Sequence, residues 1–348
     1  MYSRLRPFDF ERPTSIDDAL LTYRQAADPV YLAGATALIP AWRLGTRRQA
    51  STVISLAGVL SRFVGRDTDG LHLGAGAPVA SVLRKAGSRR DALGDALGLF
   101  ATPQVCERAT IGGNLAWAAP DSGLAPSLMA LGSVITYREA GGVERLPVAS
   151  LFETRGGLAL PAGALLTGMI VPAPAPRSAS AYVRLTSAGT DGPQVVSAAV
   201  SLAFDASGSP WRACVALGNA GPAPIAIEIL AEGPGLREFC ARALEAALAG
   251  ASLTSDLTAS SGYRRQMLRV VVRRALNAAL RRHLGGGHDH EWHRPDARGE
   301  WANRTSPDRS ERDAAGGPAG SAAPDGGESL MRGRSMRIMH RARRGTPD

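Results

Sequence analysis

Apolar residues recur along the chain with two spacings, and the alternation between these spacings predicts the fold class. A spacing of three to four residues is typical of helices, whereas short apolar runs that end at glycine or proline are typical of strands. The first spacing predicts helices at residues 15–27, 37–44, 79–87, 125–131, 235–248 and 260–284. The second predicts strands at residues 30–32, 51–59, 70–76, 133–137, 194–205 and 210–220. Short strands interleaved with short helices indicate an α/β or α+β protein.

Composition shifts divide the chain into three parts. A proline-rich stretch at residues 170–180, "IVPAPAPRSAS", is typical of a domain boundary or an exposed linker. The chain after residue 285 is rich in glycine, proline, serine and charged residues, so it cannot bury enough apolar surface to fold alone. We therefore expect one domain over residues 1–172, a second over 173–284 and a disordered tail over 285–348.

The charge pattern argues against a nucleic-acid partner. The chain has a net charge of +9, but residues 263–284 alone hold seven arginines and no acid. In that stretch Leu268, Ala275 and Ala279 share one helical face, so the arginines are expected to flank a face turned to the core. A histidine-rich tract around His288 and His293 is expected to bind metal only adventitiously.

Several classes of protein are excluded by what the sequence lacks. Three scattered cysteines, Cys106, Cys214 and Cys240, are too few for an iron–sulfur cluster and suggest no disulfide framework. Only His72 precedes the last helix, so histidine catalysis has little material, and no G-x-G-x-x-G or Walker lysine motif is present. Since no apolar stretch is long enough to span a membrane and no signal core is found, we expect a cytoplasmic protein.

Two glycine-containing segments are the candidate ligand-binding loops. They read "LAGAT" at residues 32–36 and "TIGGN" at residues 110–114, and each follows an expected extended segment. Such loops can direct consecutive backbone N–H groups at an anion, because glycine has no Cβ to block its approach. Two of them could hold the two phosphates of a dinucleotide, although each alone is more often an ordinary turn.

The order of motifs around these loops resembles one flavoprotein family. The segments "RPFDFERPTSIDDAL", "YLAGATALIPAWRLG" and "ATPQVCERATIGGNLAWAAPDSGLAPSLMALG" resemble the FAD-binding subunit of molybdenum hydroxylases, the family of xanthine dehydrogenase and carbon monoxide dehydrogenase flavoprotein chains. In the second half "YVRLTSAGTDGPQVVSAAVSL" and "WRACVALGNAGPAPIAIEIL" are similar to the C-terminal domain of that family. The resemblance covers about residues 6–284.

The resemblance implies an α+β fold: a two-subdomain α/β FAD-binding domain of the PCMH type, then a smaller α+β domain. It also implies that the first loop wraps one side of the FAD diphosphate and the second loop the other, with bare glycines in the second loop so that its backbone touches the diphosphate. The residues carried over from the family are Ala33, Gly34, Ala35, Thr36, Ala37, Thr110, Ile111, Gly112, Gly113, Asn114, Asp121, Leu166 and Arg184.

Three positions depart from the family pattern. Ala35 stands where the family has a second glycine, and a positive φ there would strain alanine by roughly 1 kcal/mol. Gly123 replaces an aspartate of the adenosine side, for which Asp121 is a possible substitute. Arg184 replaces a lysine near the flavin and changes the geometry of its charge.

The function implied is electron transfer. The resemblance predicts an FAD subunit that takes electrons from a [2Fe-2S] small subunit, works with a large molybdenum-cofactor subunit and reduces an external acceptor. No catalytic acid, base or metal ligand is expected in the chain itself. Two alternatives stay open: a degenerate structural subunit that binds FAD weakly, and a stand-alone FAD-dependent oxidase.

Overall fold

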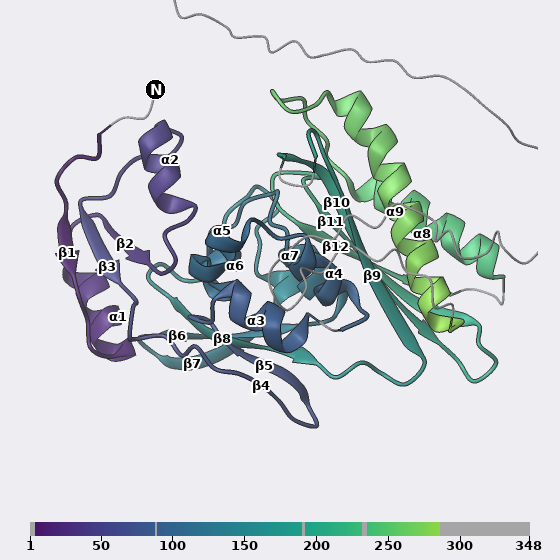
Figure 1. Cartoon of the computed structure of the whole chain (residues 1–348), viewed down its shortest axis with the longest axis horizontal. Helices are drawn as coiled ribbons and strands as arrows, with labels where there is room; N and C mark the ends of the chain where they lie inside the picture. Colours follow the sequence, from purple (N-terminus) through teal and green to yellow (C-terminus); the bar gives the residue numbers. More distant parts are fainter. Residues whose placement is uncertain (1–3, 88, 190–191, 232–234, 286–348) are drawn as a thin grey trace, which may run out of the picture. The chain divides into compact units, whose positions relative to one another are not determined.

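The computed structural model describes residues 4–285, except for 88, 190–191 and 232–234. Its first part is a parallel three-stranded sheet in the order β1 (Asp9–Glu11), β3 (Thr52–Ser55), β2 (Pro29–Leu32), as Figure 1 shows. Helix α1 (Ile16–Gln25) packs on β2 and β3 and begins at Ser15, whose Oγ accepts the N–H of Asp18 at 3.0 Å. Helix α2 (Leu38–Leu44) ends at Gly45, which has φ of +69° and provides the expected C-cap.

A five-stranded antiparallel sheet forms the second part. Its strand order is β4 (Val64–Arg66), β5 (Gly70–Gly74), β8 (Leu165–Pro172), β6 (Val134–Glu139) and β7 (Gly142–Pro147). The elements α3 (Val79–Ala86), α4 (Ala92–Gly98), α5 (Pro103–Arg108), α6 (Ile111–Ala116) and α7 (Ala125–Ala130) lie on one side of this sheet, and the 3-10 turn η1 (Val148–Ser150) follows β7 (Figure 1).

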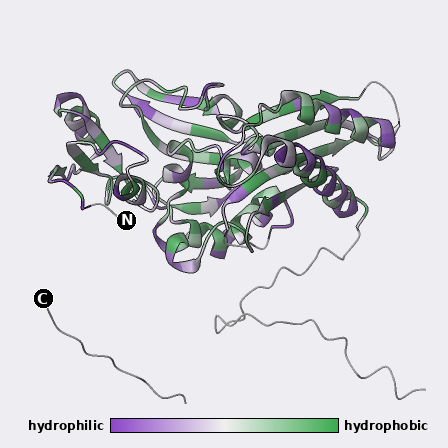
Figure 2. Ribbon diagram, turned by 90° about the horizontal axis from the view of Figure 1, so that it is seen from above, coloured by the Kyte–Doolittle hydropathy of each residue, from purple (hydrophilic) through white to green (hydrophobic). Residues whose placement is uncertain are grey.

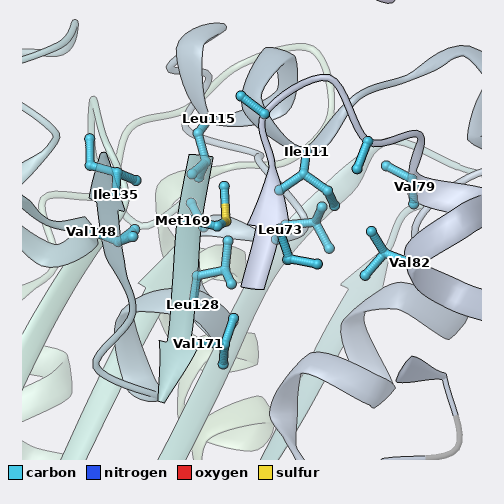
Figure 3. Close-up of a cluster of buried hydrophobic side chains, with 14 of the residues drawn as sticks. Leu73, Val79, Val82, Ile111, Leu115, Leu128, Ile135, Val148, Met169 and Val171 are labelled. Carbon is cyan, nitrogen blue, oxygen red and sulfur yellow. The ribbon is translucent and has the colours of Figure 1, made fainter. Parts of the chain in front are cut away.

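The core of this part lies between these helices and the sheet. Leu73 of β5 and Met169 of β8 face Ile111 and Leu115 of α6, and all four are at most 2% exposed (Figure 3). Burial of each such side chain stabilises the fold by roughly 1.5–3 kcal/mol. The short helix α6 is therefore fixed from below by apolar packing.

The C-terminal part is an antiparallel four-stranded sheet covered by two helices. Its order is β12 (Ile225–Leu230), β11 (Pro210–Gly218), β10 (Gln194–Phe204) and β9 (Ser178–Thr186), with α8 (Leu236–Gly250) and α9 (Ser261–His283) on one face (Figure 1). The expected face of α9 is confirmed, since Leu268, Ala275 and Ala279 are fully buried. Figure 2 shows hydrophobic residues along the strands and hydrophilic residues distributed over the helices.

A charged cluster joins the C-terminal part to the five-stranded part. Arg282 at the end of α9 donates through both terminal nitrogens to Asp95 of α4, at 2.9 Å and 2.8 Å. Asp95 also accepts the backbone N–H of Tyr182 in β9 at 2.9 Å. Bidentate arginine–carboxylate pairs fix geometry well, so β9 is held at a defined position against α4.

The sequence analysis is confirmed for the α+β fold class, the β10–β11 hairpin and the long helices, and corrected at one stretch. Residues 103–116 were expected to be irregular because of their glycines and prolines, but they form α5 and α6. Gly112 and Gly113 fall in the first turn of α6, where Thr110 caps the helix, so their low helix propensity costs little. Strands β1, β4, β7, β8, β9 and β12 and helix α4 were not predicted; β1 and β8 are stabilised by pairing with strands distant in the sequence. The tail and its histidine tract lie outside the described residues, and the domain boundaries stay predictions.

Candidate cofactor site

The two predicted loops lie against each other and line one cavity. A Cβ on Gly34 of the first loop would come within 2.2 Å of the carbonyl oxygen of Arg108, two residues before the second loop. A Cβ on Gly113 would lie 3.9 Å from the Cβ of Ala33. Gly34 is thus required by the close approach of the two backbones, and this approach brings residues 33–38 and 109–114 to the same cavity.

In the first loop the backbone N–H groups have no protein partner. Among the backbone hydrogen bonds of the described residues, none is donated by the N–H groups of residues 34–38. These residues are only half-buried and all line the cavity. Because an unpaired N–H is costly unless water or a ligand accepts from it, this run of donors is suited to an anionic ligand.

In the second loop the N–H groups of residues 111–114 are already used by the protein. The N–H of Ile111 donates to Ala77 O and that of Gly112 to Ala75 O, both at 3.0 Å. Thr110 Oγ1 accepts from Gly113 at 3.0 Å, and Thr110 O accepts from Asn114 at 2.9 Å. The second loop therefore contributes a rigid wall to the cavity rather than free donors.

The glycines of the second loop have a packing role that sequence reasoning did not anticipate. A Cβ on Gly112 would lie 2.6 Å from the Cβ of Ala75, and one on Gly113 would lie 2.7 Å from Thr110 Oγ1. We expected both residues to be bare so that their backbone could touch a diphosphate. The structure adds that their missing side chains let α6 approach β5 and receive its cap. Both glycines also line the cavity, and their contact with a diphosphate stays a prediction.

Ala35 adopts the conformation that the sequence analysis identified as strained. Its φ is +64°, in the left-handed region that favours glycine, and it is one of five described non-glycine residues with positive φ. The cost for alanine there is about 1–2 kcal/mol. The chain tolerates this strain at the turn that directs the first loop's N–H groups into the cavity.

Apolar and aromatic side chains form the remaining walls of the cavity. Leu165 and Leu166 of β8 contribute from the sheet, and Phe100 and Leu60 from the connecting segments. The ring of Tyr31 also lines the cavity, and its hydroxyl donates to Gly163 O at 3.0 Å. Burial raises the pKa of the Tyr31 phenol well above its ordinary value, so this group stays neutral. An extended ligand with a charged middle and flat aromatic ends matches these walls.

Most of the residues carried over from the family gather at this cavity. Those that line it are Ala33, Gly34, Ala35, Thr36, Ala37, Thr110, Gly112, Gly113, Asn114 and Leu166. Ile111 is 1% exposed and points into the core of the sheet instead (Figure 3). Cys106 is buried as expected, and burial raises the pKa of its thiol.

Asp121 and Arg184 are not among the lining residues and lie near Tyr182 instead. Burial raises the pKa of the Tyr182 phenol to about 12, while the charge of Arg184 lowers it and that of Asp121 raises it. Tyr182 donates to Gln194 Oε1 at 3.2 Å. Both charged residues thus lie near one buried phenol at the junction with β9. At Gly123 a Cβ would meet only Phe100, at 3.8 Å, so this position has room for a side chain.

Arg47 and Trp117 are among the lining residues that sequence reasoning missed. Arg47, just after α2, places its guanidinium 4.4 Å from the ring centroid of Trp117, the C-cap residue of α6. The pair therefore connects the three-stranded part with α6. The basic run "RLGTRR" and the tryptophan three residues after the TIGGN loop were the available signals, but neither indicates the contact without the fold.

The residues present fit FAD. The free N–H groups of residues 34–38 are suited to its diphosphate, and the apolar walls are suited to its two ring systems. Over the described part of the chain, no cluster of three or more histidine, cysteine or acidic side chains could hold a metal ion. Within the same residues, no helix has the length and apolar character required to cross a membrane.

Comparisons with known proteins give a consistent result. A family model described as the FAD binding domain in molybdopterin dehydrogenase matches residues 6–174. A second, described as the CO dehydrogenase flavoprotein C-terminal domain, matches residues 162–279. The two models together span both folded parts of the chain.

Curated relatives match over part of their length. The uncharacterized protein YgfM of Escherichia coli (strain K12) is 31% identical over 194 residues, which are 56% of this chain and 69% of YgfM. The 6-hydroxypseudooxynicotine dehydrogenase complex subunit alpha of Paenarthrobacter nicotinovorans is 28% identical over 195 residues, 55% of this chain and 65% of that subunit. The nicotinate hydroxylase hnxS of Emericella nidulans is 27% identical over 181 residues, 47% of this chain but only 13% of the hydroxylase.

A solved structure matches the fold of this chain over nearly all of its own length. One chain of carbon monoxide dehydrogenase from Hydrogenophaga pseudoflava superposes with a TM-score of 0.73 and 24% identity, covering 80% of this chain and 99% of that chain. The likeness concerns the fold of this chain.

Proposed function

Because this chain belongs to the family of FAD-binding flavoproteins of molybdopterin dehydrogenases, we propose that it is the electron-transfer subunit of a molybdenum hydroxylase complex. FAD is the cofactor of this family. The observation that carries the proposal is the run of free N–H donors at residues 34–38, which lies opposite a rigid second loop in one cavity with apolar walls.

The role proposed for the chain is to bind and orient the cofactor. The N–H groups of the first loop donate to the diphosphate. These hydrogen bonds replace those to the water that the anion loses on binding. Thr110, Gly112, Gly113 and Asn114 form the opposite wall, and Leu166 packs against a ring system. The apolar walls exclude water from the ring systems.

Electron transfer follows from the chemistry of the cofactor rather than from a side chain. Bound FAD accepts electrons singly and gives them up singly or as a pair, which suits the junction between a one-electron relay and a two-electron reaction. The residues of this chain fix its position and its electrostatic surroundings.

The partners proposed are a [2Fe-2S] small subunit and a large molybdenum-cofactor subunit. The described residues contain no cluster of metal-ligating side chains that would replace them, and one curated relative is named as a subunit of a dehydrogenase complex. We also propose a cytoplasmic location, where the three free cysteines would stay reduced.

Titration of the purified chain with FAD, followed by flavin fluorescence and absorbance, tests the cofactor site. We expect saturable binding at one FAD per chain, with release by denaturant. If neither the isolated chain nor its complex binds FAD in excess, the proposed site is wrong and the degenerate structural alternative holds.

Affinity purification of the tagged chain from its native host tests the partners. We expect the chain to bring down an iron–sulfur protein and a molybdenum protein, and the complex to reduce bound FAD when its substrate is added. Rapid oxygen consumption by the FAD-loaded chain alone, with no such partners, would favour the stand-alone oxidase instead.

A further inference from the structure

The charge of the cavity comes from one residue. Of the described residues that line the cavity, Arg47 alone carries a formal charge. Its guanidinium makes no ion pair or hydrogen bond among the described residues and lies 4.4 Å from the ring centroid of Trp117. A diphosphate that enters this cavity brings two negative charges, for which backbone N–H groups offer only partial charges.

Arg48, the neighbour of Arg47, shows that an unpaired guanidinium at the cavity is not common to both arginines of this segment. Arg48 pairs with Asp28 at 2.6 Å, and its side chain is 74% exposed. It does not line the cavity. Two adjacent arginines after the same helix are therefore used differently: one in an ion pair within the protein, the other at the cavity with its charge uncompensated.

Trp117 determines where the charge of Arg47 lies. A guanidinium over an indole ring is attracted by the electrons of the ring face, and the planar contact restricts the otherwise mobile side chain. Arg47 lies between α2 and β3 in the three-stranded part and Trp117 ends α6, so the contact bridges the two parts of the chain that form the cavity. All five donors of the stacked guanidinium stay available to an acceptor.

We propose that Arg47, positioned by Trp117, is a binding residue for the diphosphate of FAD. The proposal rests on the function proposed above, because it requires that the cavity takes FAD. The guanidinium supplies the full positive charge that the free N–H groups of the first loop lack. A charge-assisted hydrogen bond to phosphate is about twice as strong as a neutral one.

Binding of FAD and of ADP to matched variants tests this assignment. ADP is used because it carries the diphosphate without the flavin. The variants are Arg47→Gln, Arg47→Lys, Trp117→Phe and the control Arg48→Gln, each with its thermal unfolding midpoint measured without ligand. Dissociation constants are determined at low and high salt.

We expect Arg47→Gln to weaken FAD and ADP binding equally, by about tenfold at low salt, and by less at high salt because salt screens the lost attraction. Arg47→Lys should recover only part of the affinity, because lysine binds phosphate as a point charge but loses the planar contact with Trp117. Trp117→Phe should cost about threefold, since phenylalanine is a weaker cation–π partner. Arg48→Gln should leave both constants unchanged, and Arg47→Gln should lower the unfolding midpoint no more than Trp117→Phe does, because both lose the same cation–π contact.

Three results would overturn the assignment. Equal effects of Arg47→Gln and Arg48→Gln would mean that only the general charge matters. Loss of FAD binding with unchanged ADP binding would place the contact at the flavin. A much larger drop of the unfolding midpoint in Arg47→Gln than in Trp117→Phe would indicate a structural role. If the unmodified chain binds neither ligand, it is the proposed cofactor site that fails.

Discussion

The LAGAT and TIGGN loops are similar in the sequence but differ in how they use their backbones. In the first, the N–H groups of residues 34–38 donate to no described protein group, and Ala35 carries a strained positive φ. In the second, the N–H groups of residues 111–114 are all accepted by protein oxygens at 2.9–3.0 Å. The N–H groups of the first loop are available to a ligand, whereas those of residues 111–114 are already bonded to protein oxygens.

This difference teaches that a glycine-containing loop can either keep its N–H groups free for a ligand or bond them within the protein, and that the surrounding carbonyl groups decide between the two. Gly34 is required by the contact between the loops, and Gly112 by the contact of α6 with Ala75. Neither glycine has positive φ. Substitutions in the first loop should therefore change ligand binding, with an added loss of stability at Gly34, whereas substitutions in the second loop should mainly change stability.

The largest effect is expected from Gly34→Ala, which breaks the contact between the loops. Its Cβ would lie 2.2 Å from a backbone oxygen that cannot rotate away. We expect a loss of about 3 kcal/mol in the free energy of unfolding, by overpacking, together with loss of FAD binding. Urea denaturation and FAD titration measure the two effects. Gly98→Ala is the control, because nothing lies within 4 Å of its Cβ; equal behaviour of both variants would refute the contact.

Gly112→Ala should have the next largest effect, on stability alone. Its Cβ would meet Ala75 at 2.6 Å, but alanine also regains about 1 kcal/mol of helix propensity in α6. We expect a net loss of about 2 kcal/mol in the free energy of unfolding. The fraction that stays folded should bind FAD with nearly the original dissociation constant. A selective loss of affinity with intact stability would show that the second loop also provides contacts to the ligand.

Matched threonine variants give the sharpest test of the comparison. Thr110→Val removes the cap that accepts the N–H of Gly113, so we expect about 1 kcal/mol less stability and little change in FAD affinity. Thr36→Val removes a hydroxyl that lines the cavity. We expect it to leave stability unchanged and to weaken FAD binding by about 0.5–1.5 kcal/mol. Thermal unfolding and FAD titration measure both effects. The comparison between the loops would be contradicted if Thr110→Val weakened FAD binding and Thr36→Val lowered stability.

The smallest effect is expected from Ala35→Gly. Removing the Cβ at φ of +64° relieves strain, while the unfolded chain gains freedom, so the net gain in stability should be about 0.5 kcal/mol. Ala118→Gly is the control, since Ala118 has φ of +50° and does not line the cavity. Urea denaturation should show a similar gain in the free energy of unfolding for both variants, and FAD titration should show a changed affinity only for Ala35→Gly. A destabilised Ala35→Gly variant would show that the left-handed turn is not strained.

Much of the fold could be predicted because local signals were strong. Ser15 caps α1 and Gly45 ends α2, and both act through neighbours within a few residues. The apolar face of α9 followed from its spacing alone. Strand β8 was missed because its stability comes from pairing with β5 and β6, which are far away in the sequence.

The candidate site was predictable as two loops but not as an arrangement of donors. The motifs that resemble the flavoprotein family identified ten residues that line one cavity in the structure. They did not show that Ile111 points into the core, or that Asp121 and Arg184 lie near Tyr182. The partnership of Arg47 with Trp117 was equally hidden, because it joins residues 70 positions apart through space.

The sequence by itself determined the long helices, the position of both glycine loops and the family to which they belong, because these depend on local propensity and on motif order. Only the tertiary structure decided which N–H groups stay free. Ala75 and Ala77 accept the donors of the second loop, and β5 comes next to α6 only when the five-stranded sheet forms. A hydrogen bond to a distant carbonyl leaves no trace in the residues that make it, since every residue carries the same backbone carbonyl.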